Sequence, residues 1–256
     1  MRRNLFRVVC MLAASGVACS TPESPREDPA ATAPASDQLE AGEVYASRPS
    51  ISEDWPRIVF LGDSLTAGLG LATGQAVPAL VQDRLLGAGY EYAVASHGVS
   101  GDTSAGGVTR LDYALDGDVA VLVVELGGND GLRGLPVEGL EQNLDAIITT
   151  ATARDIDVLL TGMEAPPNFG EAYTASFRQV YRDLAETHDV AFVPFYLEGV
   201  AGVPELNQPD GIHPNAEGSR IILETIWAVL EPMLEWPGEG PERRRPERVG
   251  QESAAR

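Results

Sequence analysis

The sequence predicts an α/β fold in which a five-stranded parallel sheet lies between two layers of helices. First, apolar strand-like runs alternate with amphipathic helix-like stretches along the middle of the chain, as expected for parallel strands joined by crossover helices. Second, residues 119–124 (Val-Ala-Val-Leu-Val-Val) show no polar alternation, which is typical of a strand covered on both faces.

The elements can be justified in chain order. The predicted strands are residues 57–62, 91–96, 119–126, 156–163 and 190–195. The predicted helices are residues 76–88, 104–116, 137–153, 171–187 and 214–232. The first strand is an apolar run that stops abruptly at Gly62. In the third helix Leu140, Leu144 and Ile147 recur at helical spacing, and Pro136 suits an early helical position. No internal repeat is present.

The first 19 residues predict an export signal, because a basic end precedes an apolar stretch (residues 8–18) that is too short to span a membrane. Cys19 follows Gly16-Val17-Ala18 and resembles the lipidated cysteine of bacterial lipoproteins, although Gly16 stands where leucine is usual. We therefore expect a protein of the bacterial cell envelope, anchored to a membrane through a lipid on Cys19 and facing the periplasm or the exterior. Plain secretion and an apolar terminus without function are the alternatives.

The remaining segments differ sharply in composition. Residues 20–54 are rich in Pro, Ala, Ser and acidic residues and predict a disordered tether. Residues 237–256, with an arginine run at 243–245, predict a disordered tail. One domain is expected between them, over residues 55–236.

Composition excludes several function classes. The chain has a net charge of −20, and the predicted domain holds 8 arginines and 26 acidic residues, so no nucleic-acid partner is expected. Lysine is absent, which removes a Ser-Lys dyad, a Schiff-base lysine and a P-loop. Both cysteines, Cys10 and Cys19, lie outside the domain, which therefore has no disulfide framework and no cysteine zinc site. The histidines are His97, His188 and His213.

Four polar turns belong to the carboxyl edge of the predicted sheet, where open α/β folds bind ligands. Three follow strands and one precedes the last helix: Gly62-Asp63-Ser64-Leu65, Ser96-His97-Gly98 through Thr103, Gly127-Gly128-Asn129-Asp130, and Asp210-Gly211-Ile212-His213. Because parallel strands share this edge, we expect the four turns to converge.

The residues of these turns suit acyl transfer. Ser64 needs a base to become a nucleophile, and His213 can serve if a carboxylate holds its other nitrogen. Asp210 stands only three residues away. The negative charge that develops on a carbonyl oxygen needs fixed donors, which the N–H groups of Ser64 and Gly101 and the amide of Asn129 can supply.

These motifs resemble the four sequence blocks of the SGNH (GDSL) hydrolases, and the branch of thioesterase I, lysophospholipase L1 and arylesterase most closely. The resemblance covers residues 56–232 and includes Glu125-Leu126-Gly127-Gly128-Asn129-Asp130 and Asp210-Gly211-Ile212-His213-Pro214-Asn215. Ser96 departs from the pattern, because this branch usually has asparagine there.

The resemblance implies a flavodoxin-like α/β/α sandwich and hydrolysis without a metal or other cofactor. By position, Ser64 is the nucleophile, Asp210 and His213 complete the triad, and Ser64, Gly101 and Asn129 form the oxyanion hole. The segment 163–173 similarly resembles the thioesterase branch and is expected to line the acyl pocket, with Pro166, Pro167, Asn168 and Phe169 as substrate-binding residues.

Other readings of the same residues remain open. His97 is a rival base on the same edge, but it lacks a carboxylate spaced like Asp210, so a surface role is expected. His188 falls near a helix end and is expected to be structural, and Asp63 is expected to fix its loop. The remaining acids of the turns lack a recognisable metal-ligand spacing: Asp102, Glu125 and Asp130.

The sequence thus predicts a serine esterase acting on a small-molecule or lipid ester or thioester, with arylesterase, thioesterase and lysophospholipase as the types considered. A deacetylase of envelope polysaccharide is the alternative enzyme. A non-catalytic lipoprotein that binds glycan or a partner on the same fold is the alternative of another class, since a fold does not guarantee activity.

Overall fold

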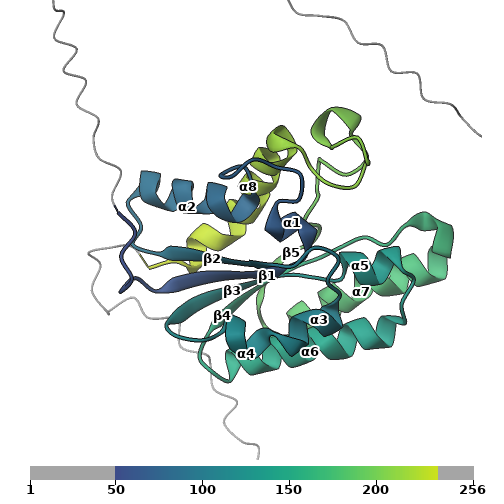
Figure 1. The fold of residues 1–256 in the computed structure, drawn as a ribbon. Coiled ribbons are helices and arrows are strands. Elements are labelled where there is room, and N and C mark those ends of the chain that lie inside the picture. Colours follow the sequence, from purple (N-terminus) through teal and green to yellow (C-terminus); the bar gives the residue numbers. More distant parts are fainter. Residues whose placement is uncertain (1–49, 236–256) are drawn as a thin grey trace, which may run out of the picture. The chain divides into compact units, whose positions relative to one another are not determined.

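The computed structural model describes residues 50–235 of the chain. Five parallel strands form one sheet in the order β2-β1-β3-β4-β5 (Figure 1). Helices α1, α2 and α8 cover one face, and α3 to α7 cover the other (Figure 1). This is the flavodoxin-like strand order, so the predicted fold class is confirmed. The export signal with Cys19, most of the tether and the tail lie outside the described residues.

The elements follow the predicted order closely. The strands are β1 (Arg57–Gly62), β2 (Ala93–Gly98), β3 (Val119–Glu125), β4 (Asp157–Thr161) and β5 (Ala191–Val193). The helices are α1 (Ser64–Ala67), α2 (Val77–Ala88), α3 (Ser104–Thr109), α4 (Leu111–Ala114), α5 (Gly128–Leu132), α6 (Val137–Thr152), α7 (Glu171–His188) and α8 (Ala216–Leu230). Short 3-10 turns occur at η1 (Pro167–Phe169), η2 (Pro204–Leu206) and η3 (Glu231–Met233).

Two features differ from the predicted elements. The helix expected over 104–116 is broken into α3 and α4, which meet at Arg110. The short helices α1 and α5 were not predicted, because each follows a strand directly and is too short to show an apolar period. Both short helices begin at the carboxyl edge.

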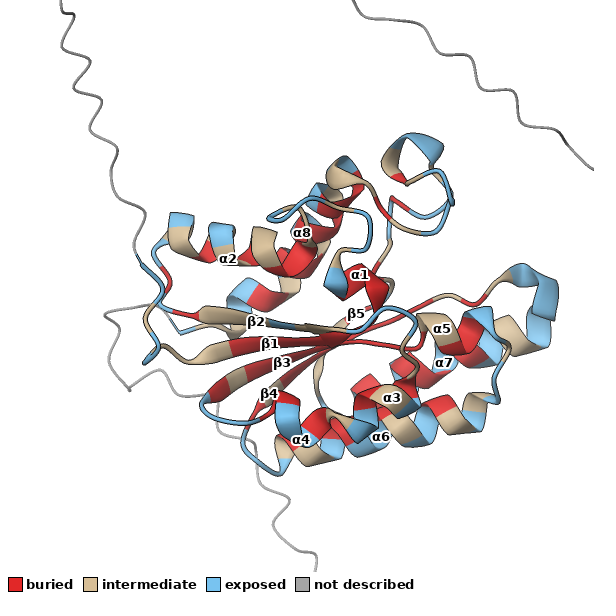
Figure 2. Cartoon of the chain, viewed as in Figure 1, coloured by how far each residue is buried: buried red, intermediate tan, exposed pale blue. Residues whose placement is uncertain are grey.

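The core is centred on the middle strands. In β1 the side chains of Ile58, Val59, Phe60 and Leu61 are fully buried, because helices cover both faces of the sheet (Figure 2). Burying one such side chain stabilises a fold by about 1.5–3 kcal/mol. β1 and β3 are therefore firmly held, whereas the residues of the edge strand β2 are only partly buried or exposed.

The strand register aligns the turns. Gly62, the last residue of β1, is level with Gly98 at the end of β2 and with Glu125 at the end of β3. The chain therefore leaves three neighbouring strands at the same height. Within residues 50–235, every helix is too short or too polar to traverse a bilayer.

Candidate active site

The nucleophile turn, residues 62–66, joins β1 to α1. Ser64 is the first residue of α1 and is only 9% exposed. Asp63 caps the helix, because its Oδ1 accepts a hydrogen bond from the Leu65 N–H at 2.9 Å. Helix and strand together fix the position of the Ser64 hydroxyl.

A buried acid from β3 supports the nucleophile turn. Glu125 Oε2 accepts hydrogen bonds from Thr66 Oγ1 at 2.7 Å, from the Thr66 N–H at 3.2 Å and from the Asp63 N–H at 3.3 Å. Gly62 allows this approach, since a Cβ there would lie 2.0 Å from Thr66 Oγ1 and 2.5 Å from Glu125 Oε2. Gly62 is thus required sterically for Glu125 and Thr66 to form these hydrogen bonds.

The base loop, residues 207–215, precedes α8. Asp210 Oδ1 accepts hydrogen bonds from the N–H groups of Ile212 at 2.9 Å and His213 at 3.0 Å. The loop closes through an antiparallel bridge between its end segments. These bonds explain how a carboxylate and an imidazole three residues apart meet within one loop.

The structure joins the two segments at the predicted triad. The Ser64 Oγ to His213 Nε2 distance is 2.8 Å, and the His213 Nδ1 to Asp210 Oδ2 distance is 2.7 Å. The Ile212 N–H, the His213 side chain and the His213 N–H lower the pKa of the Asp210 carboxyl from 3.8 to about 2. With the Nδ1 proton directed at Asp210, Nε2 is free to accept the Ser64 proton.

The three predicted oxyanion donors, the N–H groups of Ser64 and Gly101 and the amide of Asn129, belong to turns and helix starts at the carboxyl edge. The oxyanion turn, residues 98–102, carries Gly101 with a φ of +83°, a conformation that favours glycine. Among the described residues, the N–H groups of Ser64 and Gly101 donate to no other group. Asn129 Nδ2 donates to Asp63 Oδ2 at 2.8 Å, which leaves the second N–H of the amide for a substrate oxygen.

The acids beneath the site interact with one another. Burial is the main reason why the pKa of Glu125 is raised well above its ordinary value, and the negative charge of Asp63 adds to the effect. Burial likewise raises the pKa of Asp63, while the Leu65 N–H and the Asn129 amide oppose the rise. Two buried carboxyls in contact with the same turn favour a proton on Glu125, since burial raises its pKa further than that of Asp63.

The other predicted residues fall into separate places. The ring of His97 packs edge-on against Tyr113 in α4, with centroids 5.5 Å apart, and over residues 50–235 it has no hydrogen bond to Ser64, Asp210 or His213. His188 ends α7 and contacts Asp145 of α6 at 2.7 Å, as expected for a structural residue. Phe169 is 40% exposed in η1, where its ring lies against Gly134 after α5.

The acids considered as metal ligands bind different partners. Asp102 pairs with Arg110, and Asp130 accepts hydrogen bonds from the Ser104 N–H and hydroxyl. Over residues 50–235, no group of three or more His, Cys, Asp or Glu side chains is arranged to hold a metal ion.

Sequence reasoning missed several supporting residues. Glu125 was considered as a metal ligand and as part of a family block, but its support of the nucleophile turn was not predicted, although an acid at the end of an otherwise apolar strand signals a buried carboxyl. Arg110 and Arg133 contact the oxyanion turn, and Gln208 ties the base loop to the Leu69 carbonyl. No local pattern indicated these three, because each bond spans many residues or two loops.

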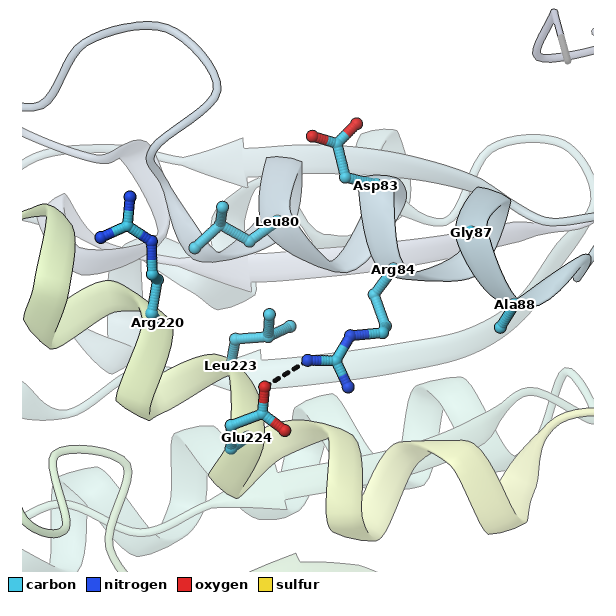
Figure 3. A pocket seen from close by; sticks show the side chains of 8 residues that line it. All are labelled: Leu80, Asp83, Arg84, Gly87, Ala88, Arg220, Leu223 and Glu224. Atoms are coloured by element: carbon cyan, nitrogen blue, oxygen red, sulfur yellow. Dashed lines mark hydrogen bonds and ion pairs between the residues drawn. The ribbon is translucent and has the colours of Figure 1, made fainter. Parts of the chain in front are cut away.

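A surface groove between α2 and α8 contains none of the predicted site residues (Figure 3). Its lining includes Leu80, Leu223 and two arginines. Arg84 pairs with Glu224 and Arg220 pairs with Glu217, so both cations are already neutralised by neighbouring acids. The groove results from the packing of α2 against α8 and contributes no residue to the candidate active site.

Comparison with known proteins agrees with this geometry. The profile described as the GDSL-like Lipase/Acylhydrolase family matches residues 60–221. The chain is 46% identical over 178 residues to the esterase TesA of Pseudomonas aeruginosa, covering 69% of this chain and 89% of that protein. It is 36% identical over 178 residues to thioesterase 1/protease 1/lysophospholipase L1 of Escherichia coli strain K12, covering 69% and 84%. A crystal structure of TesA matches with a TM-score of 0.67 and 46% identity, covering 70% of this chain and 99% of that one.

Proposed function

Since the chain belongs to the GDSL-like lipase/acylhydrolase family of carboxylic ester hydrolases, we propose that it cleaves acyl esters and thioesters through an acyl intermediate on Ser64. The observation that carries the proposal is the hydrogen bond of 2.8 Å between Ser64 Oγ and His213 Nε2. These residues lie 149 positions apart, so their contact is a product of the fold.

The first half of the reaction forms the acyl enzyme. Ser64 Oγ attacks the carbonyl carbon while its proton passes to His213 Nε2, and the Asp210 carboxylate stabilises the resulting imidazolium. The carbonyl oxygen becomes an anion held by the N–H groups of Ser64 and Gly101 and by the Asn129 amide. When the carbonyl re-forms, the alcohol or thiol leaves with the proton from His213.

The second half releases the acid. His213 takes a proton from a water molecule, whose oxygen attacks the acyl carbon and forms a second oxyanion in the same hole. Collapse of this intermediate returns the proton to Ser64 Oγ and frees the carboxylic acid. The two steps use the same residues in the reverse order.

Apolar groups around the site favour an apolar acyl or aryl group over a sugar acetate. Six of the exposed large hydrophobic side chains lie in loops or short helices at the carboxyl edge: Leu69, Val99, Leu132, Leu135, Phe169 and Ile212. We assign the acyl group to the side formed by η1 and α5, where Pro166, Pro167, Asn168 and Phe169 are the proposed contacts. Phe169→Ala is then expected to raise KM for longer p-nitrophenyl esters more than for the acetate, measured across a series of chain lengths.

The test of the proposal is covalent labelling of Ser64. A fluorophosphonate probe should modify the wild-type protein at Ser64, located by peptide mass spectrometry, and should leave Ser64→Ala unmodified. The same variant should lose turnover of p-nitrophenyl butyrate while it keeps its melting temperature. A folded wild-type protein that resists the probe would favour the binding-lipoprotein alternative. Preferential release of acetate from acetylated polysaccharide would favour the deacetylase.

We also propose that the protein is exported and held at a membrane of the cell envelope by a lipid on Cys19, which lies outside the described residues. The support is the basic and apolar sequence before Cys19. In cell fractionation the wild type is expected with the membranes, and Cys19→Ser is expected in the soluble fraction. Equal membrane recovery of both would remove the anchor from the proposal.

A further inference from the structure

We propose that Arg110 is a positioning residue that fixes the distance between the nucleophile turn and the oxyanion turn. This inference rests on the proposed function, since it gives Arg110 a part in the same reaction. Arg110 lies at the break between α3 and α4, so its presence there also accounts for a helix that ends earlier than its sequence predicts.

One guanidinium joins three segments of the carboxyl edge. Arg110 Nη2 donates to the Gly62 carbonyl at 2.7 Å, Nη1 donates to the His97 carbonyl at 2.5 Å, and Nε donates to Asp102 Oδ2 at 2.7 Å. Gly62 opens the nucleophile turn, His97 belongs to β2, and Asp102 ends the oxyanion turn. Because the guanidinium is planar and rigid, these three acceptors are held at fixed separations.

The bonds constrain the donor at Gly101. The oxyanion turn is closed by the Asp102 N–H donating to the Val99 carbonyl at 3.0 Å. The Val99 N–H donates to the Gly62 carbonyl at 3.1 Å, the same oxygen that Arg110 contacts. Gly101 thus lies between Val99 and Asp102, and both are connected to the Gly62 carbonyl, Val99 directly and Asp102 through Arg110. Ser64 follows Gly62 by two residues, so the same oxygen locates the nucleophile.

The Arg110–Asp102 pair is shielded from water. The side chains of Arg110 and Asp102 are 19% and 16% exposed. The Asp102 carboxylate also lies over Gly106, where an added Cβ would come within 1.6 Å of Asp102 Oδ1. The Asp102 carboxylate therefore has little conformational freedom, and its ion pair with Arg110 limits the motion of the guanidinium as well. Shielded pairs of this kind constrain geometry more than pairs on the open surface do.

Arg133 provides a comparison within the same turn. Its Nη2 donates to the Gly101 carbonyl at 2.7 Å, but the residue is exposed and contacts one segment only. Arg154 provides a control outside the site, because it pairs with Asp112 of α4 at the surface. We expect the effect of substitution to fall in the order Arg110, Arg133, Arg154.

The decisive variant is Arg110→Lys, which keeps a positive charge beside Asp102 but cannot reach three acceptors with one planar group. Full-length variants would be compared by kcat and KM for p-nitrophenyl butyrate and by the inhibition constant of a trifluoromethyl ketone, whose adduct with Ser64 carries the oxyanion. We expect kcat to fall about 10- to 100-fold, below the 10²–10³-fold loss for removing a donor outright. KM should change less than about threefold, since ground-state binding is retained. The inhibition constant should rise in parallel with the loss of kcat.

Each outcome has a clear meaning. An unchanged kcat and inhibition constant in Arg110→Lys would overturn the inference. The fraction of protein molecules that fluorophosphonate labels at Ser64 gives a second check. If this fraction falls by the same factor as kcat, the inference is also overturned, because Arg110 would then act on folding alone. If Arg110→Ala does not fold, Arg110→Lys still decides. Failure of the wild type to react with the fluorophosphonate would instead refute the proposed function. Arg154→Ala should retain wild-type kinetics.

Discussion

The nucleophile turn and the base loop meet at one hydrogen bond but are held by different means. In the nucleophile turn, Asp63, Ser64 and Thr66 are at most 9% exposed. Its support comes from Glu125, about 60 residues away in sequence. In the base loop, Asp210 has a side chain that is 45% exposed and binds residues two and three positions on.

This difference separates stability from activity. The nucleophile turn is part of the core, so a change there disturbs packing as well as chemistry. Apart from the bond of Gln208 to the Leu69 carbonyl, the base loop is organised largely by its own hydrogen bonds, so a change at Asp210 or His213 should affect the reaction and leave the unfolding free energy nearly intact. The carboxyl edge thus combines a fixed nucleophile with a base whose position depends on local bonds.

The largest expected effect comes from the base loop itself. His213→Ala should lower kcat by about 10⁶-fold, as removal of the base does in other Ser-His-Asp hydrolases. The melting temperature should stay close to that of the wild type, because the base loop keeps the hydrogen bonds that Asp210 Oδ1 accepts from its own backbone. The double variant with Ser64→Ala should be no slower than either single variant, since the two residues act as a unit. A large loss of stability in His213→Ala would break the comparison.

Asp210→Asn should have the next largest effect, lowering kcat by about 10⁴-fold through the wrong imidazole tautomer. A pKa of about 2 means that the Asp210 carboxylate is ionised throughout the neutral and mildly acidic range. A lowered pKa favours the folded state above the ordinary value, and this contribution is lost only as the pH falls toward 2. Between pH 5 and pH 8 the kcat of the variant should therefore stay far below that of the wild type, because the carboxylate that it lacks is ionised throughout that range. A kcat of Asp210→Asn close to that of the wild type anywhere in that range would show that the reaction does not need the carboxylate.

Asn129→Ala tests the buried nucleophile turn, because Asn129 donates to Asp63. Loss of one oxyanion donor should lower kcat by about 10²–10³-fold with KM little changed. Asp63 would also lose a donor to its buried carboxylate, so the unfolding free energy should fall by about 1–3 kcal/mol. The kinetics and urea unfolding of the same preparation would give both quantities. If kcat falls while the unfolding free energy stays that of the wild type, Asn129 behaves like a residue of the base loop.

Sequence reasoning works well where the determining contacts are local. The spacing of Asp210 and His213 encodes their own hydrogen bond, and the apolar runs encode the strands. The convergence of Ser64 with His213 followed from one topological rule, that parallel strands share a carboxyl edge. The flavodoxin-like strand order came from the resemblance, because alternation alone does not specify which strands are neighbours.

The support of the site could not be predicted in the same way. Glu125 and Arg110 act through bonds between segments that are distant in sequence, and so does the bond of Asn129 to Asp63, although Asn129 itself is predicted as an oxyanion donor. At the break between α3 and α4, Arg110 donates to three segments of the carboxyl edge, so tertiary contacts prevail there over a helical pattern. The contacts of Pro166 to Phe169 with an acyl group and the lipid on Cys19 stay predictions.

The smallest effect concerns Glu125 and measures stability alone. Burial raises the pKa of Glu125 well above its ordinary value of 4.5. An acid with a raised pKa in the folded state contributes stability that is complete below the unfolded value and is lost as the pH rises toward the folded value. For one such group the loss approaches about 1.4 kcal/mol per pH unit. The wild type should therefore lose unfolding free energy as the pH rises above about 4.5.

Glu125→Gln removes this titration while it keeps an oxygen for the donors from Thr66 and Asp63. Relative to the wild type, the variant should gain stability between pH 5 and pH 8, by about 1 kcal/mol or more, measured by urea unfolding at both values. Glu224→Gln, at an exposed acid, is the matched control and should show no such gain. If Glu125→Gln and the wild type differ equally at the two pH values, Glu125 is ionised in the folded protein. The nucleophile turn would then be supported by two buried negative charges, Glu125 and Asp63. The nucleophile turn and the base loop would differ only in how deeply they are buried.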